Sequence, residues 1–102
     1  MKLADLAPAF REDRFASRIV HTEDSLRLVV FDLLPGQRVP PHRNPATVTL
    51  HVLQGSGLFG GSDRQVQASA GNLLVYEPGE IHWIEAQEET LRFLAVLTPA
   101  PA

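Results

Sequence analysis

Two of the four histidines in the sequence stand where a side chain can bind a metal ion. His42 follows Pro40-Pro41 and His82 follows the turn-forming Pro78-Gly79-Glu80, so each lies at the mouth of an expected strand. Neutral imidazole is a common ligand of Zn, Fe, Cu and Ni, and two histidines from separate strands can converge on one ion. A histidine at a strand end also often makes an ordinary hydrogen bond, so the residue types alone leave both interpretations open.

The elements that must position these histidines are short segments separated by glycine and proline. Apolar and β-branched runs predict strands at residues 15–21, 26–34, 47–53, 58–59, 64–69, 72–77, 82–86 and 90–98. Short strands with a turn signal every few residues indicate an all-β fold, an antiparallel sandwich or barrel. Only residues 3–14 are expected to hold a helical turn, which Pro8 limits.

The composition restricts the class of protein. The chain has 102 residues, of which 44% are hydrophobic and 21% charged, and its formal net charge is -3. This predicts one globular domain over 1–102, with the barrel at about 15–98 and peripheral segments 1–14 and 99–102. Without a cluster of Lys and Arg we expect no nucleic-acid partner. Without cysteine, neither a disulfide framework nor a thiolate metal site can form.

No apolar run predicts a membrane partner, because the longest runs are far shorter than a bilayer span. The opening MKLADLAPAF lacks the apolar core of a secretory signal. We therefore expect a cytoplasmic protein, which the absence of cysteine also fits.

Two motifs of the chain resemble the paired motifs of the cupin superfamily of small β-barrels. The first family motif, G-x5-H-x-H-x3-E-x6-G, aligns with Gly36, His42, Asn44, Val48 and Gly55. The second, G-x5-P-x-G-x2-H-x3-N, aligns with Gly71, Glu77, Gly79, His82 and Ala86. Fifteen residues separate the motifs, as in compact bacterial cupins. The resemblance spans roughly 18–98 and implies a double-stranded β-helix, or jelly-roll barrel, that pairs as a homodimer.

The same resemblance implies a metal site that is incomplete. Cupin ligands are the two histidines and the glutamate of the first motif and the histidine of the second. Here His42 and His82 match, whereas Asn44 replaces one histidine and Val48 replaces the glutamate. An amide oxygen is a weaker donor and valine donates nothing, so a divalent ion (Fe, Zn, Mn, Ni or Cu) should bind less tightly than in a complete site.

Asn44 and His51 are the two candidates for a third ligand. In a regular strand His51 and Val48 point to opposite faces, so only a bulge would turn His51 toward the position of the family's glutamate. Without a bulge, His51 is a hydrogen-bonded residue on the outer face or at a subunit contact. The residues expected to face the barrel interior are Leu28, Val30, Leu50, Val52, Tyr76, Phe93 and Ala95. Such an apolar lining suits a small organic molecule.

Three functions are consistent with these features. The first is a cupin that binds a divalent metal and a small organic molecule; with iron or a similar ion, the resemblance implies oxygen-dependent or isomerase chemistry. The second is a metal-free cupin that binds a ligand as a sensor or carrier. The third is a structural homodimer module without a ligand. The sequence assigns no catalytic residue, because no separate acid–base pair and no phosphate-binding loop is present.

Overall fold

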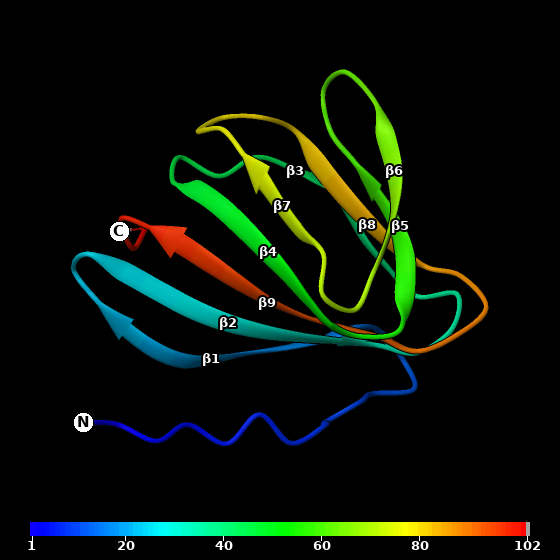
Figure 1. The fold of residues 1–102 in the computed structure, drawn as a ribbon, viewed down its shortest axis with the longest axis horizontal. Helices are drawn as coiled ribbons and strands as arrows, with labels where there is room; N and C mark the ends of the chain where they lie inside the picture. The colour runs from blue at the N-terminus through cyan, green and yellow to red at the C-terminus, as the bar shows by residue number, and fades with distance from the viewer. Residues whose placement is uncertain (102) are drawn as a thin grey trace.

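The computed structural model describes residues 1–101, which contain nine strands and no helix. The strands are β1 (Ala16–Glu23), β2 (Leu26–Leu33), β3 (Arg38–His42), β4 (Thr47–Gln54), β5 (Ser56–Gly60), β6 (Gln65–Ser69), β7 (Leu73–Tyr76), β8 (His82–Ala86) and β9 (Leu91–Thr98). They form two antiparallel sheets, with strand orders β1-β2-β9-β4-β7 and β3-β8-β5-β6 (Figure 1). The all-β prediction is confirmed. In the described part of the chain no helix is long and apolar enough to cross a bilayer.

Strand β4 shows why the interior is apolar. Its residues Val48, Leu50 and Val52 are buried, and the residues between them face outward, so the alternation of residue types correctly predicted the inner face. Between the sheets, Phe93 of β9 meets Phe59 of β5 edge-on, with ring centres 5.8 Å apart. Burial of one such large side chain contributes about 1.5–3 kcal/mol, so this contact helps to hold the two sheets together.

The face of strand β2 that points to the interior is the opposite of the one predicted. Leu28 and Val30 were expected to line the interior, but the register with β9 places Phe31 directly opposite Phe93. Directly opposed residues share a face of the sheet, so Val29 and Phe31 point inward and Leu28 and Val30 point outward. The Phe31 and Phe93 rings stack with centres 4.8 Å apart. Because β2 is apolar on both faces, its sequence does not reveal which face is inside.

Strand β3 was not among the predicted strands, because Pro40 and Pro41 cannot donate backbone hydrogen bonds. It lies at an edge of its sheet, where proline is tolerated. Its register with β8 shifts between Val39 and His42, and beyond this irregularity His42 is paired with His82. The proline-containing edge strand therefore places His42 beside His82.

The N-terminal residues form an extended strap and not the helical turn that was expected. Arg18 donates hydrogen bonds to the carbonyl oxygens of Asp5 (3.2 Å) and Ala7 (2.8 Å), and the Asp32 carboxylate accepts one from the Ala9 N–H (2.8 Å). The backbone groups that a helical turn would use are thus bound to side chains of the sheet. Figure 1 shows this segment running past β1, with the N-terminus clear of both sheets.

Candidate metal and ligand site

The structure brings His42 and His82 together, although forty positions separate them in the chain. Their ring centres lie 4.1 Å apart and the ring planes are inclined by 60°. His42 is exposed at the end of β3, whereas His82 at the start of β8 is only 3% exposed. This separation is short enough for both rings to bind one ion at a metal–nitrogen distance of about 2.1 Å.

Both rings have the tautomer that a metal ligand needs. Nδ1 of His42 lies 2.9 Å from the Pro40 carbonyl oxygen, and Nδ1 of His82 lies 3.0 Å from that of Glu80. A carbonyl oxygen only accepts, so each Nδ1 carries the proton and each neutral ring keeps a lone pair on Nε2. Hydrogen bonds of this kind orient histidines that bind metals in proteins.

The Nε2 atoms of both histidines lack a hydrogen-bond partner within residues 1–101. In the same part of the chain, every fully buried side-chain nitrogen or oxygen has a partner. Nε2 of His82 is therefore not fully buried, and His82 is among the residues that line the cavity described below. Burial lowers the pKa of His82, and the neighbouring His42 ring lowers it further, although the Glu80 carbonyl and carboxylate oppose this shift. His82 is thus neutral at pH 7, the form that binds metals.

Tyr76 supports His82. The two rings stack with centres 4.6 Å apart and planes inclined by 23°. The Tyr76 hydroxyl donates a hydrogen bond to the Gly60 carbonyl oxygen at 3.1 Å, and burial raises the pKa of Tyr76 to about 12, so the phenol stays protonated. Sequence reasoning assigned Tyr76 only to the pocket lining. Its contact with His82 joins β7 of one sheet to β8 of the other, which strand spacing does not reveal.

An apolar cavity of about 110 Å³ lies beside the histidines. It is lined by Val29, Phe31, Val39, His42, Asn44, Val48, Leu50, His82, Ile84, Phe93, Ala95 and Leu97. No charged side chain is among these lining residues, and valine occupies the position of the motif's glutamate. Of the predicted lining residues, Leu50, Phe93 and Ala95 are present, whereas Leu28, Val30, Val52 and Tyr76 are not. The cavity therefore suits a small molecule with an apolar part.

Asn44 lies at this cavity. Its side-chain oxygen Oδ1 accepts a hydrogen bond from the Ala46 N–H at 2.9 Å, which leaves the second lone pair of that oxygen for an ion. Its backbone carbonyl accepts a hydrogen bond from the Gly79 N–H at 2.8 Å, so the turn after β3 is tied to the turn before β8. The Arg43 guanidinium reinforces this link by donating to the Gly79 carbonyl oxygen at 2.7 Å.

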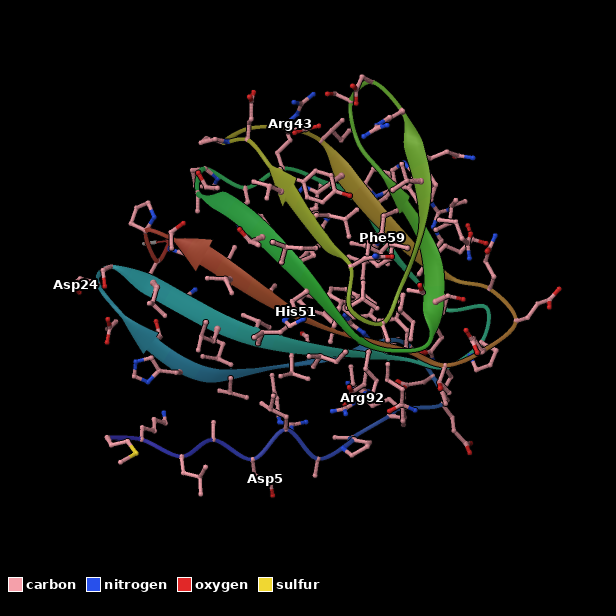
Figure 2. All side chains as sticks on the ribbon, viewed as in Figure 1. Asp5, Asp24, Arg43, His51, Phe59 and Arg92 are labelled. Atoms are coloured by element: carbon pink, nitrogen blue, oxygen red, sulfur yellow. The ribbon has the colours of Figure 1, made fainter. Side chains whose placement is uncertain are left out.

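His51 does not lie at the cavity. It is exposed on β4, directly opposite Leu94 of β9, and the register between these strands is regular from Thr47 to Val52. The bulge that would have turned His51 toward the position of Val48 is therefore absent from this stretch. Figure 2 labels His51 beside β4 and well below Arg43.

The donors gathered here are two imidazole nitrogens and one amide oxygen. No group of three or more His, Cys, Asp or Glu side chains that could hold an ion occurs in the described residues. A neutral donor set of this kind fits a divalent ion held less tightly than one with a carboxylate, with positions left for water or a ligand.

Comparison with known proteins identifies relatives of the chain. The sequence profile of the Cupin domain matches residues 29–97. An RmlC-like cupin protein from Desulfovibrio desulfuricans has 28% identity, a TM-score of 0.88 and coverage of 97% of each chain. The protein TT1209 from Thermus thermophilus has 19% identity, a TM-score of 0.90 and coverage of 99% of this chain and 100% of that one. No curated protein matches the chain.

An enzyme is also among the similar structures. The DMSP lyase DddQ from Ruegeria pomeroyi has 22% identity and a TM-score of 0.80, and the match covers 84% of this chain and 47% of that one. At this identity the similarity establishes the fold alone.

Proposed function

This chain belongs to the cupin family, and we propose that it binds a divalent metal ion through His42 and His82 together with a small organic molecule in the adjacent cavity. One observation carries the proposal: both histidines donate Nδ1–H to a backbone carbonyl, and both leave Nε2 without a partner in the described residues.

Asn44 is the third donor in this proposal, through the free lone pair of Oδ1. His51 is left out because it is exposed on the opposite face of β4. A divalent ion bound here would supply a Lewis acid or a site for oxygen. The apolar lining contributed by Phe31, Phe93 and Leu50 would hold the apolar part of the ligand and exclude water.

Metal content and metal titration test the proposal. The wild-type protein, His42→Ala, His82→Ala and the matched control His51→Ala are stripped with a chelator and titrated calorimetrically with Zn²⁺, Ni²⁺, Mn²⁺ and Fe²⁺. We expect one ion per chain in the wild type and in His51→Ala. Either site substitution should weaken binding by more than the roughly 10- to 100-fold that the loss of an outer hydrogen-bond partner causes. No binding by the wild type, or equal binding by His82→Ala, would contradict the proposal.

A metal-free ligand-binding protein is the second candidate, and Val48 in the cavity wall favours it because valine supplies no charge to hold a cation. A screen of small organic molecules by thermal unfolding tests this function, since a ligand of the folded state raises the Tm. A ligand whose Tm increase is the same with and without chelator, and in His42→Ala, would favour this candidate over the metal-dependent one.

A further inference from the structure

The cavity beside the histidines has no charged side chain in its wall. Val48, which is 3% exposed, occupies the position where a carboxylate would otherwise face the ion. The proposed donors are also neutral, namely Nε2 of His42, Nε2 of His82 and Oδ1 of Asn44. A divalent ion held by these groups would keep its double positive charge beside an apolar wall. Burying a charge in such surroundings is costly unless an opposite charge accompanies it.

The nearest acid along the chain from His82 does not supply this charge. Glu80 precedes His82 by two residues, but it is not among the residues that line the cavity. Its carboxylate accepts hydrogen bonds from the Ser62 N–H (3.3 Å), the Ser62 hydroxyl (3.1 Å) and the Glu77 N–H (3.0 Å). These bonds hold it toward the partly exposed hairpin between β5 and β6, where solvent screens its charge. The ligand is then the group that can provide a negative charge at the ion.

The charged side chain next to Asn44 is basic. Arg43 is exposed, and its guanidinium donates to the Gly79 carbonyl oxygen at 2.7 Å. The Asn44 carbonyl oxygen accepts from the N–H of the same glycine at 2.8 Å, so the guanidinium is held against the turn that borders the site. A cation fixed beside Asn44 attracts an anionic ligand and disfavours a cationic one.

The size and lining of the cavity restrict the kind of anion. An apolar cavity of about 150 Å³ holds benzene, whereas this one measures about 110 Å³. It is therefore too small to enclose an aromatic ring, and an aliphatic tail of about four carbons fits. Apart from the two imidazoles, only Asn44 among the lining side chains carries N–H groups. A phosphate with its several acceptor oxygens would lack donors there, whereas a carboxylate has two oxygens and a single charge.

We propose that the ligand of this cavity is a short aliphatic monocarboxylate, whose charged group lies at the ion and whose tail packs against Phe31 and Phe93. This inference rests on the proposed metal site and adds the chemical class of its ligand. Val48 is then a specificity-determining residue, because its neutral side chain leaves the negative charge to the ligand. Ion and carboxylate should bind cooperatively, since each lowers the cost of burying the other.

Cooperativity is tested by titrating the chelator-stripped protein with Zn²⁺ at increasing butyrate concentrations, with a metal buffer that fixes the free Zn²⁺. Saturating butyrate should lower the Kd for Zn²⁺ by about 5- to 150-fold, the usual range for coupled sites. Butyramide has the same tail without the charge and should leave this Kd unchanged. Acetate lacks two methylenes, each worth about fourfold in affinity when buried, and should be needed at about 15-fold higher concentration than butyrate.

Two substitutions of Val48 separate charge from size. Val48→Glu supplies the negative charge within the protein, so it should bind Zn²⁺ more tightly without butyrate and should lose the cooperativity. Val48→Gln has nearly the same shape without the charge and should retain the cooperativity. Ala95→Leu fills part of the cavity and should remove the preference for butyrate over acetate, while both carboxylates still lower the Kd for Zn²⁺. Circular dichroism checks the fold of each variant, and the comparison of butyrate with butyramide needs no variant at all.

The possible failures of this inference and of the proposed function are distinguishable. Zn²⁺ binding that butyrate does not strengthen, or that butyramide strengthens equally, would overturn the inference and leave the metal site in place. Loss of cooperativity in both Val48 variants would also overturn it, because the larger side chain would then exclude the ligand by volume. A Tm increase by butyrate that is the same with and without chelator would overturn it in favour of metal-free binding. A protein that binds no Zn²⁺ at any butyrate concentration would overturn both proposals.

Discussion

The outer face of the five-stranded sheet and the inner face of the four-stranded sheet each contain a polar cluster. On the outer face, Asp32 and Arg92 are paired across β2 and β9 and are only 1% and 7% exposed. On the inner face, His42 and His82 are paired across β3 and β8. Both clusters are pairs of titratable side chains placed directly opposite each other by strand register, but they differ in how completely their polar atoms are used.

In the outer cluster both oxygens of the Asp32 carboxylate accept a hydrogen bond. Asp32 accepts from Arg92 Nε at 2.7 Å and from the Ala9 N–H at 2.8 Å, and Arg18 lies 3.7 Å from its second oxygen. Arg92 also donates to the Leu6 carbonyl oxygen. Figure 2 labels Arg92 between the strands and the N-terminal strap that these bonds hold in place.

The inner cluster, by contrast, uses one nitrogen of each ring and leaves the other without a partner in the described residues. A buried polar cluster with every group bonded rigidifies the fold, and one with a free lone pair at a cavity can accept something from outside. The comparison therefore distinguishes a structural pair from the pair that we propose binds an ion, on the basis of hydrogen bonding and not of residue type.

The largest effect is expected from removing the carboxylate of the outer cluster. Asp32→Ala leaves Arg92 buried without its carboxylate and should lower the free energy of unfolding by about 3–5 kcal/mol, measured by urea denaturation. The control is Asp13→Ala, which removes an exposed pair with Arg11 and should have a far smaller effect because solvent screens it. Equal losses in the two variants would show that the outer cluster does not have the structural role assigned to it.

The next largest effect is expected from adding a carboxylate to the inner cluster. Val48→Glu places a carboxylate in the cavity wall, and in the presence of a chelator its burial should lower the free energy of unfolding by about 1–3 kcal/mol. Zn²⁺ should restore this loss, because the new carboxylate adds both a donor and a charge to the two histidines. The measurement is urea denaturation with chelator and with Zn²⁺, beside the wild type. If Zn²⁺ does not raise the stability of the variant more than that of the wild type, the cavity does not lie within reach of the ion.

A smaller effect should follow from loosening the support of His82. Tyr76→Leu removes the stacked ring and should weaken metal binding about tenfold, the lower end for loss of a supporting residue. Tyr76→Phe keeps the ring and should retain metal affinity, while losing about 1 kcal/mol of stability with the hydrogen bond to Gly60. Calorimetric titration and urea denaturation separate the two quantities. Equal metal affinity in the Leu and Phe variants would argue against a positioning role for the ring.

The smallest effect concerns pH in protein kept free of metal by a chelator. Burial lowers the pKa of His82, so below about pH 6.5 the unfolded chain binds a proton that the folded ring does not. The contribution of His82 to the free energy of unfolding should therefore be fully present above about pH 6.5 and should decrease as the pH falls below it. His82→Gln should flatten this slope between about pH 5 and 8. The same slope in both proteins would mean that His82 is not the group responsible.

Local sequence features predicted much of the fold. The segment 82–86 was predicted and observed as a strand with the same bounds, and alternation identified the buried face of β4. The motif resemblance that pointed to a cupin is confirmed by the match to the family profile and by similar structures. Turn residues and a period of two are local properties, and each can be recognised within a few positions of the chain.

Features that depend on strand register could not be predicted from local sequence patterns. The prediction chose the wrong face of β2, because both faces are apolar and only the pairing of Phe31 with Phe93 decides between them. It missed β3, because prolines are acceptable only at an edge and edge position is a property of the whole sheet. It also missed the contact of Tyr76 with His82, which arises from the approach of two sheets.

The sequence by itself determined where the strands lie, which residues turn the chain, and that two histidines occupy the cupin motif positions without the carboxylate. Only the tertiary structure decided that the two rings meet, that both Nε2 atoms stay free among the described residues, and that His51 faces away from the cavity. The physical reason is that side-chain identity is encoded locally, whereas the alignment of lone pairs depends on hydrogen-bond register between strands that are far apart in the chain.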